Sequence, residues 1–165
     1  GRNFNLDSPL MRPVPVNDDG IPFLLATHYR AKSQAQVRRA ARLGAGIISI
    51  SDTPDEYAQV IQQVNEAASE LGRDASSMEK AFHITVNMDP DLKKAEADAV
   101  EWLTGYYGSD IWGTRWGPFG GPESVADRIA EYVKAGVGTV VVRFASFHPE
   151  KQLEIFLDQV APAYA

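Results

Sequence analysis

The chain has 165 residues, carries 16 Lys and Arg against 22 Asp and Glu, and contains no cysteine. Its length suits one domain with a sizeable core, and the lack of cysteine excludes a disulfide scaffold, a thiolate nucleophile and a Cys-ligated zinc or iron–sulfur centre. The net charge of −6 argues against a dedicated nucleic-acid binder, and no apolar run approaches the ~20 residues that span a bilayer. We therefore expect a cytoplasmic protein whose partners are neither nucleic acid nor membrane.

The sequence begins with an irregular segment and continues with short strands. Residues 1–20 are rich in Pro, Asn and Asp and show no periodicity, so we expect an irregular lead-in before a single α/β domain at 21–165. Short apolar runs are typical of strands in a parallel sheet, and in chain order they lie at 21–27, 46–50, 80–87 and 138–144. We expect the first strand to be buried on both faces.

A helix is predicted after each strand. Ser33 and Gln36 have the spacing of a capping box at the start of the first helix, and Gly44 is expected to end that helix with a positive φ. Thr53 and Glu56 give the second helix a stronger start. Later helices are predicted to begin near 90, at 122 and at 149. The last is expected to bury an apolar stripe, which consists of Leu153, Phe156, Leu157 and Val160.

The order is therefore strand–helix repeated, with an extra loop and helix in the third unit. This alternation predicts a parallel α/β sheet with right-handed crossovers, which binds ligands at the carboxyl ends of its strands. Two architectures fit: four βα units of a (β/α)8 TIM-type barrel, which is a half-barrel with parallel strands, or an open doubly wound four-stranded parallel sheet. Four strands are too few to close such a barrel, which runs to ~250 residues when complete.

The loop after the first strand is a candidate anion site. The stretch between Gly20 and Ser51 contains five basic residues and no acidic one, in a chain that is acidic elsewhere. Within the loop, Thr27, Arg30, Lys32 and Ser33 could add donors to the positive end of the following helix, so Thr27, His28, Arg30 and Ser33 are candidate binding residues. Such a loop would bind a phosphate or a carboxylate. The alternative is that the basic residues further along the helix merely solvate its exterior.

Single histidines and one arginine also attract attention. His28 lies where it could donate to an anion or shuttle a proton, whereas His83 lies mid-strand, where a packed histidine is more common. The histidines lack the spacing of a metal motif, so no metal site is predicted. Arg143 ends a run of valines near the carboxyl end of the fourth strand. It is expected either to contact a ligand or cofactor or to form a structural ion pair.

The segment 108–121 has the most unusual composition in the chain. It holds five glycines together with Trp112, Trp116 and Phe119. Gly-rich loops that carry large apolar side chains are typical of mobile lids that close over a ligand, so these aromatic residues are candidates for a substrate lid. The alternative is a surface loop pinned by its own aromatic rings.

Two stretches resemble the C-terminal half of the bacterial luciferase-like monooxygenase family. IPFLLATHYRAKSQAQVRRAARLGAGIISIS resembles the family's fifth strand, phosphate loop and following helix, although Ala45 stands where the family often has Asp. GPFGGPESVADRIAEYVKAGVGTVVVRFASFHPEKQLEIFLDQVAPAY resembles its closing stretch. The resemblance covers about residues 9–165 and implies four βα units of a (β/α)8 barrel, the C-terminal half-barrel of a flavin- or deazaflavin-dependent oxidoreductase.

The same resemblance implies where the cofactor lies. The residues from Thr27 and His28 to Ser33 match the loop that often contacts the flavin phosphate, although His28 to Arg30 replace its usual Gly/Ser-rich form. Arg143 matches the mouth of the last strand. The family's first four strands, which supply most residues assigned to chemistry, have no counterpart in this chain, so no catalytic residue is predicted.

The resemblance therefore predicts an enzyme that uses reduced FMN, or alternatively the deazaflavin F420, to act on a small organic substrate, most commonly by monooxygenation. Its implied partners are that substrate, the reduced flavin, and either a missing N-terminal half or a homodimer partner. Two alternatives are a non-catalytic half-barrel that dimerises to cover its open edges and an independent phosphate- or nucleotide-binding α/β module.

Overall fold

The computed structural model describes residues 2–5, 7, 14–16, 20–109 and 113–164. Its strands are β1 (Leu24–Ala26), β2 (Gly46–Ser49), β3 (Glu79–Met88), β4 (Phe119–Gly120) and β5 (Thr139–Phe144). Its main helices are α1 (Gln34–Leu43), α2 (Pro54–Glu70), α3 (Leu92–Tyr107), α4 (Pro122–Lys134) and α5 (Pro149–Gln159). In these described ranges, no helix combines the length and the apolar character needed to cross a membrane.

The strands form one parallel sheet in sequential order. β1 pairs with β2, β2 with β3, and β3 with β5, while the two-residue β4 continues the β2 side of β3. A doubly wound sheet reverses its strand order at a switch point, and no reversal occurs along β1, β2, β3 and β5. The order is that of successive strands in a barrel wall.

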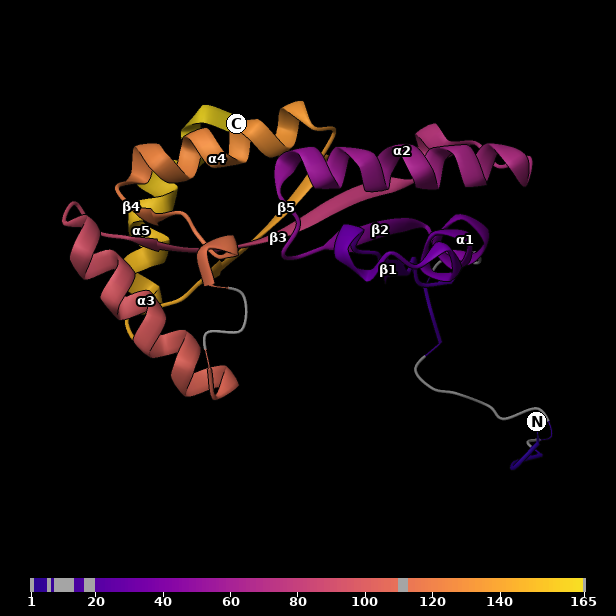
Figure 1. Ribbon diagram of the computed structural model, residues 1–165, viewed down its shortest axis with the longest axis horizontal. Helices are drawn as coiled ribbons and strands as arrows, with labels where there is room; N and C mark the ends of the chain where they lie inside the picture. The colour runs from indigo at the N-terminus through magenta and orange to yellow at the C-terminus, as the bar shows by residue number, and fades with distance from the viewer. Residues whose placement is uncertain (1, 6, 8–13, 17–19, 110–112, 165) are drawn as a thin grey trace.

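Four of the five main helices, α1, α2, α4 and α5, contribute to one core on one face of the sheet. Phe82, Ile84 and Val86 of β3 share this face with their register partners on β5 and contribute to one core with α1, α2, α4 and α5. Figure 1 shows α2 and α4 on one side of β3 and α3 on the other. α3 belongs to a second, smaller cluster that contains Leu103 and Trp116. The sequential order of the parallel strands confirms the half-barrel prediction and contradicts the doubly wound alternative.

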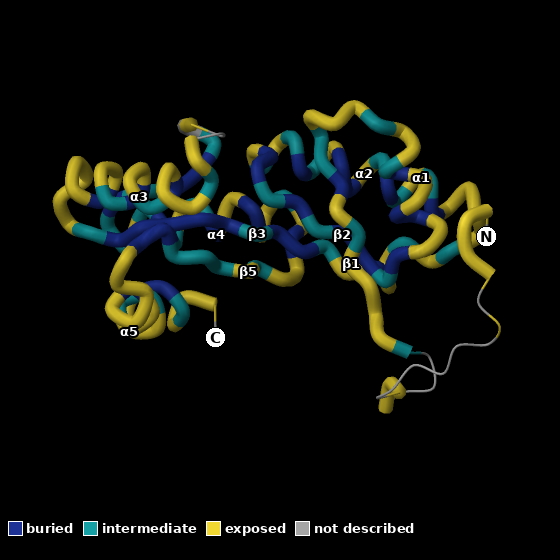
Figure 2. The backbone as a smooth tube through the Cα atoms, turned by 90° about the horizontal axis from the view of Figure 1, so that it is seen from below, coloured by how far each residue is buried: buried dark blue, intermediate teal, exposed yellow. Residues whose placement is uncertain are grey.

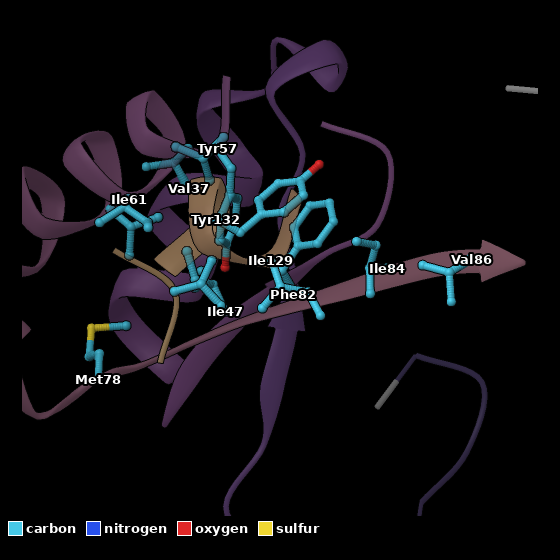
Figure 3. Packing of buried hydrophobic residues seen from close by; sticks show 14 of the residues in the cluster. Val37, Ile47, Tyr57, Ile61, Met78, Phe82, Ile84, Val86, Ile129 and Tyr132 are labelled. Carbon is cyan, nitrogen blue, oxygen red and sulfur yellow. The ribbon is translucent and has the colours of Figure 1, made fainter. Parts of the chain in front are cut away.

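Three aromatic rings hold the centre of this core (Figure 3). The ring of Phe82 stacks on Tyr132, with centroids 3.9 Å apart, and meets Tyr57 at 5.4 Å. The Tyr57 hydroxyl donates to the carbonyl of Ala81 at 2.6 Å, and the Tyr132 hydroxyl donates to the carbonyl of Asp52 at 2.7 Å. Burial raises the pKa of Tyr57 far above its ordinary value and that of Tyr132 to about 12. Both hydroxyls therefore remain neutral donors: Tyr57 anchors α2 to β3, and Tyr132 anchors α4 to the loop after β2.

The helix caps follow the sequence in part. Thr53 and Glu56 form the complete capping box at the start of α2. At α1, Ser33 accepts from the N–H of Gln36, but the Gln36 side chain accepts from the N–H of His28 instead of completing the box. The predicted positive φ of Gly44 is wrong, because φ is −77° there. Glycine is needed at this position for space, since a Cβ would lie 2.7 Å from the carbonyl oxygen of Gly46.

Residues at the edges of the sheet are more exposed than the sequence predicts. Figure 2 shows the burial of each residue along the backbone. β1 is shorter than expected and largely exposed instead of buried on both faces, with Leu24 37% exposed. Val160, the residue that caps the C-terminus of α5, is buried as predicted, but Leu153 and Leu157 of the helix are 46% and 55% exposed. β1 and β5 each have one neighbouring strand among the described residues, so apolar side chains at both edges lack a packing partner there.

A matched pair of glycine substitutions tests the close packing of β2 on β3. A Cβ on Gly46 would lie 2.7 Å from the Cβ of Glu79, whereas one on Gly105 of α3 meets nothing within 4 Å. Gly46→Ala should lower the free energy of unfolding by about 1–3 kcal/mol, because the strands must move apart. Gly105→Ala should leave it unchanged or raise it by up to ~1 kcal/mol, because alanine favours the helix. Urea unfolding of the native protein and of the two variants measures both changes in the free energy of unfolding. Equal effects of the two substitutions would contradict the close approach of Gly46 to Glu79.

Candidate functional site

Buried polar side chains gather where the parallel strands end. They include Thr27, Ser49, Ser51, Asp52, Thr85, Asn87 and Ser146, each at most 4% exposed. Because the carboxyl ends of neighbouring parallel strands meet at one edge, these residues come from separate βα units yet lie along the same rim. Buried polar groups need hydrogen-bond partners, and the partners found here divide the rim into distinct clusters.

The first cluster links the loop after β1 to the loop after β2. The Ser49 hydroxyl donates to Asp52 Oδ2 at 2.6 Å, and His28 Nδ1 lies 2.9 Å from the same hydroxyl oxygen. A serine hydroxyl has one hydrogen. Since Asp52 receives it, His28 must donate from Nδ1, and its Nε2 is the ring position available to a ligand. Asp52 also accepts from the N–H of Tyr29 at 3.0 Å.

Asp52 is therefore the residue that fixes the shape of the first loop. It is 1% exposed, and its second oxygen, Oδ1, is buried with no hydrogen-bond partner among the described residues. The sequence reasoning missed Asp52 and Ser49. The run from Ser49 to Thr53, most of it polar and immediately after a buried strand, could have indicated them. Its spacing alone does not predict a contact with His28.

A pocket of ≈ 290 Å³ opens beside this loop at the start of α1. Its lining residues are His28, Tyr29, Lys32, Ser33, Gln34, Val37, Val60 and Gln63. The first N–H groups of a helix lack partners within the helix, and Lys32 is an exposed cation in the lining of the pocket. These groups can hold an oxyanion such as a phosphate, so the donor set fits the phosphate of a flavin-type cofactor.

The other predicted residues of this loop lie nearby in different environments. Thr27 is 1% exposed, and its hydroxyl donates to the carbonyl of Leu25 at 3.1 Å. Its hydroxyl hydrogen is thus used within β1. Arg30 is exposed on the short 3₁₀ helix Tyr29–Ala31, from which a long side chain can reach a bound anion.

The second cluster surrounds Arg143 at the end of β5. Its Nε and Nη2 donate to the Thr85 hydroxyl oxygen at 3.1 and 2.7 Å, and Nη1 donates to the hydroxyl of Tyr107 at 2.6 Å. Its guanidinium carbon also lies 4.8 Å from the ring centroid of Trp116, 5.5 Å from that of Tyr107 and 5.8 Å from that of Trp102. No carboxylate among the described residues forms an ion pair with Arg143, so the structural ion pair considered from the sequence is not found there.

The aromatic residues of the 108–121 segment have different positions. Trp116 is 5% exposed and packs with Leu103 of α3, while Phe119 is half-buried on β4. Trp112 lies outside the described residues. Arg115 pairs with Glu56 and donates from Nε to the carbonyl of Ser51 at 2.8 Å, which ties the segment to the loop after β2. The lid role of these aromatic residues stays a prediction.

A third cluster fastens α3 to the rim. Asn87 donates from Nδ2 to Asp98 Oδ2 at 2.6 Å and to the carbonyl of Ala145 at 2.7 Å. The Ser146 hydroxyl donates to the same Asp98 oxygen at 2.9 Å. Asp98 is thus committed to internal hydrogen bonds. His83, lower on the same face of β3, has its pKa lowered by burial and by the charge of Arg143, so the ring is neutral near pH 7.

The structure thus groups the predicted site residues in two places. Thr27, His28, Arg30 and Ser33 share the loop after β1, whereas Arg143 and Trp116 lie together at β5 and the 108–121 segment. β2 and β3 separate the two places, which is about 14 Å at ~4.8 Å per strand spacing. The described ranges contain no group of His, Asp and Glu arranged to hold a metal ion.

Comparison with known proteins identifies relatives. A sequence model described as "Luciferase-like monooxygenase" matches residues 1–139. The F420-dependent glucose-6-phosphate dehydrogenase of Mycobacterium leprae is 23% identical, over 98% of this chain and 53% of that relative. The chain therefore spans about half the length of the curated relative it matches.

Solved structures share the fold. An F420-dependent secondary alcohol dehydrogenase in complex with an F420–acetone adduct superposes with a TM-score of 0.76 at 21% identity, over 98% of this chain and 54% of that one. The EDTA monooxygenase of Chelativorans sp. BNC1 superposes with a TM-score of 0.68 at 19% identity, over 99% of this chain and 48% of that one. These neighbours are barrels of which this chain covers about half. With its sequential parallel strands and this family match, the chain belongs to the luciferase-like monooxygenase family and forms half of a (β/α)8 barrel.

Proposed function

We propose that this chain is the C-terminal half of a flavin- or deazaflavin-dependent oxidoreductase that acts on a small organic substrate. The observation that carries the proposal is the family match over residues 1–139 of a chain whose sheet has the strand order of a barrel wall. The strands β1 and β5 have one neighbour each among the described residues. Edge strands with unpaired backbone groups need covering, and a further set of barrel strands would cover both.

The loop after β1 binds the cofactor's phosphate in this proposal. The pocket at the start of α1 offers the Lys32 ammonium and the helix N-terminus to the phosphate, and His28 lines the same pocket. Arg30 extends from the same loop. FMN carries a phosphate at the end of its ribityl chain and F420 carries a phosphodiester there, so one loop could serve either cofactor. The names of two relatives include F420, and we retain FMN as the first candidate with F420 as its alternative.

A reduced flavin or deazaflavin supplies the electrons of the reaction. The residues of this chain bind and orient the cofactor and enclose the site of reaction. Asp52 and Ser49 hold His28 and the phosphate loop in one geometry. Trp116 packs its buried indole against α3 and beside the guanidinium of Arg143. Apolar packing of this kind helps to exclude water from a reactive intermediate.

Cofactor titration tests the phosphate loop. Arg30→Ala and Lys32→Ala should each weaken binding of FMN or F420 by about 10–100-fold, since a hydrogen bond to a charged group contributes ~1.5–3 kcal/mol. Their effect on riboflavin, or on the deazaflavin without its phosphate, should be small. Arg42→Ala, further along α1, is the control and should leave all affinities unchanged. An equal loss for the phosphate-bearing and phosphate-free forms would overturn the role of this loop.

A second variant tests the hydrogen bonds behind His28. Ser49→Ala removes the acceptor of His28 Nδ1–H and the donor to Asp52, so the imidazole should lose its fixed orientation. Nitrogen-15 NMR of the native protein should find the hydrogen of neutral His28 on Nδ1, and a mixture of both tautomers in the variant. The FMN or F420 affinity should fall several-fold in parallel. A hydrogen found mainly on Nε2 in the native protein would contradict the bonding order.

A further inference from the structure

Arg143 is a half-buried cation on the inner face of the sheet. On β5 it is the register partner of Thr85 on β3, and it shares this face with His83 and Asn87. His83 is neutral near pH 7 because burial and the charge of Arg143 lower its pKa. The nearby carboxylate, Asp98, accepts hydrogen bonds from Asn87 and Ser146. No described carboxylate therefore neutralises Arg143.

The guanidinium also keeps hydrogen-bonding capacity. It has five N–H groups in a fixed fork. Among the described residues, two hydroxyl oxygens accept hydrogen bonds from it: that of Thr85 from Nε and Nη2, and that of Tyr107 from Nη1. Each terminal nitrogen thus has a second N–H beyond these bonds. Because the Tyr107 hydroxyl accepts from Arg143, its own hydrogen is left to donate.

The surrounding rings explain how the charge is tolerated without a carboxylate. Trp116, Tyr107 and Trp102 lie with their centroids 4.8–5.8 Å from the guanidinium carbon. Aromatic faces attract a cation by about 0.5–2 kcal/mol each, which holds an arginine in place but leaves its full charge unneutralised. Because the side chain is half-buried among these rings, solvent screens its charge less than that of an exposed arginine, which strengthens its attraction for an anion.

We propose that Arg143 and Tyr107 bind an oxyanion of the substrate, a carboxylate, sulfonate or phosphate group, at the mouth of the barrel. The guanidinium fork matches the two oxygens of such a group, and the Tyr107 hydroxyl adds a third donor. This inference rests on the proposed function, because it makes the anion part of the molecule that the oxidoreductase transforms. It assigns Arg143 to the substrate and not to the cofactor's phosphate, from whose loop about 14 Å separates it.

The test uses the native protein and two probes of similar size, benzoate and neutral benzyl alcohol. Isothermal titration, with the quenching of tryptophan fluorescence as a second signal, should detect saturable binding of benzoate and at least tenfold weaker binding of the alcohol. Arg143→Gln should weaken benzoate binding at least tenfold, and Arg143→Lys should restore part of it, because lysine keeps the charge without the fork. Tyr107→Phe should weaken it several-fold with little effect on the alcohol.

Inorganic phosphate and FMN are the remaining probes of the binding experiment. Phosphate should compete with benzoate at the Arg143 site, and Arg143→Gln should leave the affinity for FMN or F420 unchanged. The proposal is overturned if Arg143→Gln binds benzoate as the native protein does, if the alcohol binds equally well, or if the variant loses FMN affinity but not riboflavin affinity, which would assign Arg143 to the cofactor. Benzoate binding is measurable without cofactor, so a failure of the proposed cofactor site is seen separately.

Discussion

The side chains of β3 point alternately to the two faces of the sheet, and the rest of the structure depends on this alternation. β3 pairs with β2 and β4 along one edge and with β5 along the other, so its two faces are set for the whole sheet. Phe82 points into the core between Tyr57 and Tyr132, while Thr85 points to the face that carries Arg143. A register shift of one residue would exchange these faces. It would place polar groups against the helices and remove the acceptor of Arg143.

The sequence was sufficient for the repeating units and for much of the helix boundaries, because these depend on local chemistry. The capping box of Thr53 and Glu56 needs only three residues of spacing and formed as predicted. Burial at the sheet edges was predicted poorly. Leu153 and Leu157 follow the apolar periodicity of a packed helix yet are exposed, since periodicity reports which face is apolar and not whether a neighbour lies against it.

The clusters at the rim could not be predicted from the spacing of residues in the sequence, for a related reason. His28, Ser49 and Asp52 join because β1 and β2 pair in a particular register, and no local pattern specifies that register. Arg143 was recognised as a charge inside a valine run, but its partners come from β3, α3 and the 108–121 segment. An alternation argument on β3 would have placed His83, Thr85 and Asn87 on one face. It would not have supplied the aromatic rings.

The 113–120 segment connects the two clusters mechanically. Arg115 contacts Glu56 and the carbonyl of Ser51, next to Asp52, while Trp116 stands over the guanidinium of Arg143. Adjacent residues of one short segment are therefore held by the loop after β2 and by the cation on β5. A displacement of this segment would loosen both contacts together, because two consecutive residues have little freedom to move independently. The 113–120 segment thus bounds one side of the region between the phosphate loop and Arg143. Its position depends on the contacts of Arg115 with the loop after β2 and on those of Trp116 with Arg143.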